Sequence, residues 1–182
     1  MPDQPLLEFS ALRATIRERG TARVVVFWFG IAVWAALLFV MAAAIPVPAA
    51  VLVPLVVLVA TFEAVFALHV GVERIGRYLQ VFHSDTWEKT AMAYGRRFPG
   101  GGPDPLFASL FVLAALVNLL AMAAVDPVPG EWIPLSFAHA AFVLRIDRAR
   151  RAAARQRAVD LERFQTIAGA GHPADAIPSR DT

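Results

Sequence analysis

The stretch that decides the fold is VVVFWFGIAVWAALLFVMAAAI, residues 24–45, which carries no charged side chain. As an α-helix it would be about 33 Å long. The apolar core of a bilayer is about 30 Å thick and is crossed by about 20 apolar residues. The stretch therefore predicts a membrane-spanning helix. A cleaved signal sequence fits less well, because its apolar region is only about 7–15 residues long.

Three further apolar stretches follow, and with the first they predict four spans at about residues 24–45, 49–72, 105–125 and 132–146. No helix breaker follows the second stretch, so its helix should continue to Phe82. The fourth stretch is the shortest, because about 15 residues rise only about 22 Å. It either crosses by thinning the bilayer locally, with Arg145 extended to the surface, or lies as a re-entrant or interfacial helix.

The distribution of charge favours four spans. All 17 Lys and Arg residues lie before the first span, between the second and third, or after the fourth. The two short outer loops carry only Asp126 and Glu131. Cytoplasmic loops collect Lys and Arg, and three spans would place the C-terminal arginines on the opposite side. We therefore expect an all-α integral membrane protein, a four-helix transmembrane bundle with both termini in the cytoplasm.

The segments outside the bilayer are expected to be helical and basic. Leu6–Arg19 has the apolar spacing of an amphipathic helix, which often lies on a membrane surface. In the inner loop, a short helix from Thr86 to about Tyr94 would place Trp87 and Tyr94 at the lipid headgroups. The resulting organisation is a cytoplasmic N-terminal segment 1–23, a membrane domain 24–146 with inner loop 83–104, a basic cytoplasmic helix 147–168 and a disordered tail 169–182.

Anionic lipid headgroups are the expected contacts of the basic helix, since each arginine near the surface contributes about 1 kcal/mol. Nucleic acid is not expected as a partner, because the positive-inside pattern already accounts for the charge. The many Arg, Ala, Gly and Pro residues, with a single Lys, suggest a GC-rich bacterial genome. On that ground the sequence indicates a bacterial inner membrane protein.

Polar residues inside the predicted spans are the candidate functional residues, because ionisable groups are costly in a bilayer. Glu63 and Asn118 are both expected near mid-membrane and in contact with each other. We favour a polar clamp between helices over a proton- or ion-coupled site. His69 and His139 are expected at one depth, where a facing pair would be able to ligate a b-type haem.

The densest polar segment near a span end is HVGVERIGRY, residues 69–78. Glu73 and Arg77 have the spacing of a helical ion pair. Arg74 and Arg77 are expected at the membrane boundary, as is Arg145 at the end of the fourth span. These charges either form a site or only anchor the helix ends.

Composition excludes several classes of protein. With 58% apolar and 18% charged residues, the chain has too little polar surface for a typical soluble enzyme domain. It has no cysteine, which excludes disulfides, cysteine zinc sites and iron–sulfur clusters. No recognisable catalytic motif is present, so neither an enzyme nor a metal site is expected.

Three classes of function remain. We favour a structural or accessory subunit of a membrane assembly, with a membrane-protein partner or a second copy of the chain. The second class is an ion- or proton-coupled transport component that uses Glu63, Asn118 and His69. The third is a haem-binding subunit that uses His69 and His139.

Overall fold

The computed structural model describes residues 4–45, 47–83, 86–98 and 104–170, and every regular element within them is helical. The all-α prediction is confirmed. The elements are α1 (Gln4–Ala44), the 3₁₀ helix η1 (Pro48–Val51), α2 (Leu52–Phe82), α3 (Thr86–Arg97), α4 (Ala108–Ala123) and α5 (Pro129–Gly169). Two helices, α1 and the Pro48–Phe82 stretch, are long and apolar enough to cross a membrane.

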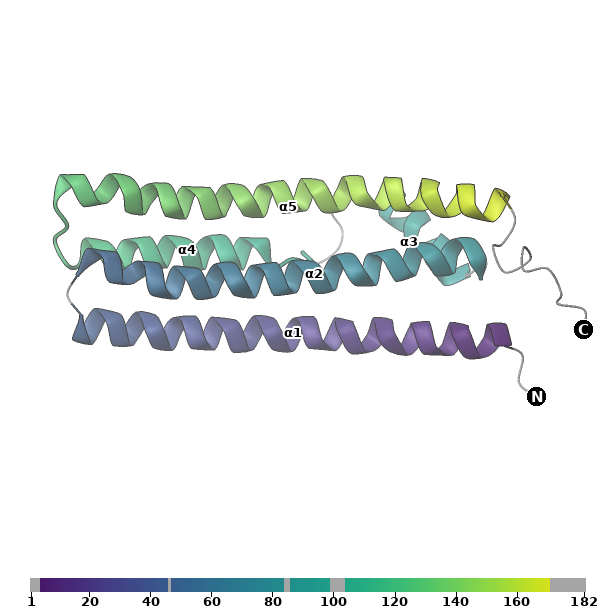
Figure 1. The fold of residues 1–182 in the computed structure, drawn as a ribbon, viewed down its shortest axis with the longest axis horizontal. Coiled ribbons are helices and arrows are strands. Elements are labelled where there is room, and N and C mark those ends of the chain that lie inside the picture. Colours follow the sequence, from purple (N-terminus) through teal and green to yellow (C-terminus); the bar gives the residue numbers. More distant parts are fainter. Residues whose placement is uncertain (1–3, 46, 84–85, 99–103, 171–182) are drawn as a thin grey trace, which may run out of the picture.

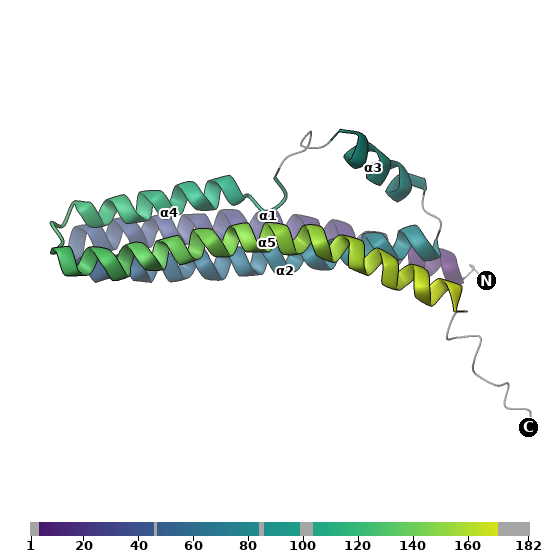
Figure 2. The same cartoon turned by 90° about the horizontal axis from the view of Figure 1, so that it is seen from above.

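Three long helices form the body of the molecule, and α2 lies between α1 and α5 along their length (Figure 1). The shorter α4 packs at the end of the bundle away from the chain termini (Figure 2). The molecule therefore has a four-helix half (residues 24–44, 48–66, 108–123 and 129–146) and a three-helix half (4–23, 67–82 and 147–169). α3 stands to one side of the three-helix half (Figure 2).

The core of the four-helix half is built from one buried phenylalanine per helix: Phe27, Phe62, Phe111 and Phe142. The Phe111 ring meets the other three edge to face, at centroid distances of 5.4, 5.3 and 6.4 Å. Edge-to-face packing aligns a positive ring edge with a negative ring face. These contacts therefore fix the rotation of the four helices about their axes as well as burying apolar area.

α1 is one uninterrupted helix, in place of the separate surface helix predicted over residues 6–19. Gly20 lies at the predicted junction, but a helical glycine costs only about 1 kcal/mol relative to alanine. The N-terminal part of α1 packs along α2. Packing against α2 therefore keeps the amphipathic segment in line with the apolar one.

Two predictions about the middle of the chain are confirmed. α2 continues beyond its apolar stretch and ends at Phe82. α3 begins at Thr86 as predicted, and it extends to Arg97, one turn further than expected.

α4 is shorter than the predicted span 105–125, because the chain turns immediately before it. The Asp104 carboxylate accepts hydrogen bonds from the Leu106 and Ala108 N–H groups at 3.1 and 2.8 Å. Phe107 adopts a left-handed conformation with φ of 51°. The helix begins only after this turn, and its 16 residues rise about 24 Å.

α5 joins the predicted fourth span and the predicted basic helix into a single helix of 41 residues. Pro134 lies near its start, where the missing N–H removes one hydrogen bond without ending the helix. The Glu131 carboxylate caps the start by accepting a hydrogen bond from the Val128 N–H at 3.0 Å. The shortest apolar helix is therefore α4, whereas the sequence predicts the shortest span at residues 132–146.

Candidate functional site

Asn118 is the centre of the polar contacts in the four-helix half and is fully buried. Its Oδ1 accepts a hydrogen bond from Trp34 Nε1 at 3.2 Å. Its Nδ2 donates to the Val51 carbonyl at 2.9 Å and lies 2.9 Å from His139 Nε2. One side chain on α4 therefore connects to α1, to η1 and to α5.

The hydrogen-bond directions around His139 are fixed by its neighbours. Its Nδ1 lies 2.7 Å from the Leu135 carbonyl, which only accepts, so Nδ1 carries the proton. Nε2 is then the acceptor for the second N–H of Asn118. Because both amide hydrogens and the amide oxygen are used, the Asn118 side chain is satisfied and works as a clamp between helices.

Glu63 does not contact Asn118, and this prediction is wrong. The Glu63 carboxylate instead accepts a hydrogen bond from Arg145 Nη2 at 2.7 Å, and the two side chains are 41% and 39% exposed. The Arg145 guanidinium also lies over the Phe66 ring at 5.1 Å. Glu63 therefore faces the outside of the α2–α5 pair, whereas Asn118 faces the interior.

His69 and His139 do not share a level along the bundle, so this prediction is also wrong. His69 borders a small cavity together with Ala153 of α5, and Ala153 follows His139 by 14 residues. This separation corresponds to about 21 Å along α5. His69 Nδ1 instead accepts a hydrogen bond from Arg23 Nη1 of α1 at 3.2 Å. The two histidines therefore do not form a pair that fits a haem.

The two histidines are predicted at one level because each lies five or six residues before an arginine on its own helix, Arg74 or Arg145. That count assumes that Arg74 and Arg145 stand at equal height. In the structure Arg145 is level with Glu63, which lies 11 residues before Arg74.

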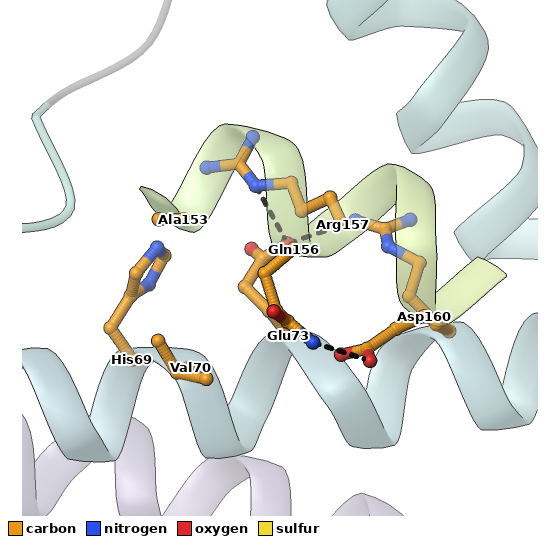
Figure 3. Close-up of a pocket in the computed structure, with 8 residues that line it drawn as sticks. His69, Val70, Glu73, Ala153, Gln156, Arg157 and Asp160 are labelled. Atoms are coloured by element: carbon orange, nitrogen blue, oxygen red, sulfur yellow. Dashed lines mark hydrogen bonds and ion pairs between the residues drawn. The ribbon is translucent and has the colours of Figure 1, made fainter. Parts of the chain in front are cut away.

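The three-helix half holds the main cluster of charged side chains, between α2 and α5 (Figure 3). Oε2 of Glu73 accepts from Arg77 Nη2 at 2.9 Å and from Arg157 Nε at 3.1 Å. The predicted ion pair between Glu73 and Arg77 is therefore confirmed, and Arg157 joins it from α5. Arg77 is 88% buried, since its side chain is only 12% exposed, so the shared carboxylate neutralises a mostly buried charge.

A second ion pair continues the cluster one turn further along. Asp160 of α5 is buried and accepts hydrogen bonds from Arg74 Nε at 3.3 Å and from Gln156 Nε2 at 2.8 Å. The sequence does not identify Arg157 and Asp160 as site residues, because both lie in a segment that reads as a uniformly basic helix. A spacing of four and seven residues is the signal for a packed face on this helix. It separates three buried side chains, Ala149, Ala153 and Asp160.

The far end of the three-helix half is closed by α1 against the end of α2. The Tyr78 hydroxyl donates a hydrogen bond to Glu8 Oε1 at 2.6 Å, and His83 Nε2 lies 3.9 Å from Glu8 Oε2. Phe164 of α5 packs edge-on against the Tyr78 ring at 5.8 Å. The hydrogen bond to Glu8, with burial, raises the pKa of Tyr78 to about 12, because only the neutral phenol can donate to the carboxylate.

These clusters carry structural contacts rather than recognisable chemistry. Within the described ranges, no three histidine, aspartate or glutamate side chains are grouped so that they could hold a metal ion. His69, Glu73, Ala153 and Gln156 line a cavity of about 10 Å³, which is the size that accommodates one water molecule. Comparison of the chain with protein-family models, with curated proteins and with solved structures gives no match.

Proposed function

We propose that this chain is a four-span protein of a bacterial inner membrane that acts as a structural or accessory subunit of a membrane assembly. In this proposal the four-helix half lies in the bilayer. The three-helix half extends from it into the cytoplasm, together with both termini and α3. The observation that carries the proposal is the separation of charge between the two halves.

The four-helix half carries only the Glu63–Arg145 pair and, at its outer end, Glu131. The three-helix half carries 12 arginines and 6 carboxylates. Three long helices thus change from apolar to charged at a common level, although each helix by itself is continuous. Such a change matches a membrane boundary, with the arginine-rich side in the cytoplasm.

Two contacts define the level of this boundary. Glu63 pairs with Arg145, and Arg23 contacts His69. The two positions on α2 are six residues apart, or about 9 Å, which is comparable to the headgroup layer of one leaflet. Glu63 is therefore assigned to the cytoplasmic boundary rather than to mid-membrane.

The lengths of the helices agree with this placement. From the boundary at Arg145 back to Pro129, α5 rises about 24 Å, and α4 rises a similar distance. These values are short of a 30 Å core, and local thinning of the bilayer accommodates such a difference at modest cost. The apolar stretch of α2 extends beyond Glu63 because it continues as the packed centre of the three-helix half.

The contacts favour an accessory role over the two alternatives. An ion-coupled site would need Glu63 and Asn118 to act together, but Glu63 is paired with Arg145 and Asn118 is satisfied by its own neighbours. A haem site would need the two histidines to face each other. The arginines of the three-helix half are suited to anionic headgroups and to acidic protein surfaces.

Cysteine accessibility tests the topology, because the chain has no cysteine of its own. Gly20, Gly95, Gly130 and Gly169 have open space where a Cβ atom would be added, so each can be changed to Cys without a steric clash. In spheroplasts, a membrane-impermeant maleimide should label only Gly130→Cys. Inverted membrane vesicles should show labelling of the other three. Labelling of Gly130→Cys and Gly169→Cys from the same side would overturn the four-span topology.

Native mass spectrometry of protein extracted in mild detergent tests the accessory role. A second polypeptide at fixed stoichiometry is the expected result. A bare monomer from cells that express the chain at its native level would contradict a subunit role. A mass increase equal to haem would instead support the cofactor alternative.

A further inference from the structure

The space between α3 and α5 forms an open groove of about 640 Å³ beside the three-helix half. Among the described helices α3 approaches only α2, which leaves the groove between it and α5. The floor is formed by Glu73 and Arg77 of α2. The walls are lined by Ala91, Met92 and Gly95 of α3 and by Ala154, Ala158 and Leu161 of α5. Arg157, Glu162 and Gln165 of α5 also line the groove, so its α3 wall is small or apolar and its α5 wall is mixed.

An aromatic edge borders this groove along α3. Trp87, Tyr94 and Phe98 are 65%, 59% and 54% exposed. Their spacing of seven and four residues, with Ala91 between, places them on one face of the helix. The rings of Tyr94 and Phe98 pack against each other at 4.9 Å. Exposed tryptophan and tyrosine beside an apolar groove are typical anchors of protein interfaces.

Given the boundary proposed above, lipid does not explain the exposure of Trp87 at the start of this aromatic edge. α2 ends at Phe82, 19 residues beyond Glu63, or about 28 Å from the boundary level. Four Cα–Cα steps of about 3.8 Å join Phe82 to Thr86 and reach at most about 15 Å. In this placement the start of α3 stays at least about 13 Å from the Glu63 level, beyond the headgroup layer of about 9 Å, so Trp87 is not expected at headgroup level.

A second copy of the chain is disfavoured by charge. The three-helix half has twice as many arginines as carboxylates, and α3 adds exposed Lys89 and Arg97. Two such surfaces side by side would repel each other, whereas an acidic partner would be attracted and would associate faster. The small and apolar side chains of the groove and the aromatic edge match the apolar face of an amphipathic helix, which docks through positions i, i+4 and i+7.

We infer that the groove between α3 and α5 receives an amphipathic helix of a partner protein, with acidic residues flanking its apolar face. This inference rests on the proposed topology, which places the groove in the cytoplasm. It names the surface through which the accessory role would operate. Arg157 at the rim, whose side chain is 44% exposed, with the exposed Lys89 and Arg97 nearby, would face the acidic residues of the partner.

The test uses the full-length protein in nanodiscs of zwitterionic lipid. Two fluorescein-labelled helical peptides of about 18 residues, or about 27 Å, serve as probes. They share one Leu/Ala face and carry either Glu or Lys on the other. Anisotropy should show saturable binding of the Glu peptide, at least about tenfold tighter than that of the Lys peptide, with affinity falling as salt rises. Empty nanodiscs report any binding to lipid.

Variants then locate the binding. The double variant Tyr94→Ala, Phe98→Ala should weaken binding of the Glu peptide by about tenfold or more. Phe137→Ala, which removes a ring that is 74% exposed on the four-helix half, should leave it unchanged. A photocrosslinker on Gly95→Cys should capture the Glu peptide, and one on Gly169→Cys should not.

Each adverse outcome has a distinct meaning. Equal binding of both peptides, or no effect of the double variant, overturns the inference. Self-association of the protein that the double variant abolishes assigns the groove to a second copy. Quenching of a bimane label on Gly95→Cys by brominated lipid assigns it to the membrane. If Gly95→Cys is labelled from the outer side, the proposed topology is wrong. If it is labelled from the cytoplasm and no peptide binds, only the inference about the groove is wrong.

Discussion

Replacement of Asn118 by leucine should destabilise the four-helix half more than any other single polar-to-apolar change there. The variant keeps the side-chain size but leaves three groups without their partner: the Trp34 indole N–H, the Val51 carbonyl and His139 Nε2. No other polar side chain of this half connects three elements in this way within the described ranges. The loss therefore follows from desolvated groups rather than from a cavity.

The magnitude follows from the number of hydrogen bonds. Side-chain hydrogen bonds between membrane helices contribute about 0.6 kcal/mol on average and up to about 1.7 kcal/mol. Three of them give about 2 to 5 kcal/mol, and the added apolar surface of leucine offsets a small part. We expect a loss of about 2 kcal/mol or more, measured as the free energy of unfolding in mixed micelles titrated with SDS and followed by far-ultraviolet circular dichroism.

A double-mutant cycle isolates the indole contact. Trp34→Phe removes the same donor, so the two changes together should cost less than the sum of the single changes. Leu120→Ala, at a side chain 70% exposed on the same helix, should change the free energy of unfolding by no more than about 0.5 kcal/mol. If Asn118→Leu is as stable as the parent chain, the clamp interpretation is refuted.

Three further perturbations follow from the contacts. Gly30→Ala should lower the free energy of unfolding by about 1–3 kcal/mol in the same titration, because its methyl group would collide with the buried Thr61 side chain. Tyr78 should ionise near pH 12 in the folded protein against about pH 10 when unfolded. The free energy of unfolding should fall as the pH rises from about 10 to about 12, since only the unfolded state loses the proton there. Glu8→Ala should lower the pKa of Tyr78, measured by tyrosinate absorbance. Glu73→Gln should cost about 1–3 kcal/mol, because it leaves two guanidinium groups without their shared carboxylate.

Matched controls separate these effects from general damage. Gly20→Ala meets nothing within 4 Å and should leave stability unchanged or raise it by up to about 1 kcal/mol. Asp147→Asn, which loses an exposed ion pair with Arg151, should have an effect below about 1 kcal/mol. A Tyr94→Phe background leaves Tyr78 as the only tyrosine. A Tyr78 titration that is unchanged by Glu8→Ala would contradict the assigned cause.

Local patterns were sufficient for several elements of the fold. The absence of a breaker after Val72 predicts the end of α2 at Phe82, and the start of α3 at Thr86 follows from the inner-loop sequence. The ion pair of Glu73 with Arg77 depends only on the i, i+4 spacing. These features are decided within one helix, and sequence spacing describes one helix well.

Relations between helices were predicted less well. Glu63 pairs with Arg145 and not with Asn118 as predicted. The apolar stretch of α2 reads as bilayer alone in the sequence, although its second part packs between α1 and α5. Lipid and a protein core both favour apolar side chains, so hydropathy does not tell which of the two surrounds a helix. The partners of Asn118 and of Asp160 depend on the relative height of two helices, which no spacing along one helix determines.

The continuity of α5 has a mechanical consequence. No turn separates its apolar residues from its charged ones, so the part beyond Arg145 moves as a lever with the part before it. That lever is 24 residues long, or about 36 Å. A tilt of about 5° around the boundary would displace its far end by about 3 Å, and helices change tilt when bilayer thickness changes. In the proposed membrane placement, a change in bilayer thickness that tilts α5 relative to α2 would therefore change the width of the groove between α3 and α5, because α3 contacts α2 and not α5.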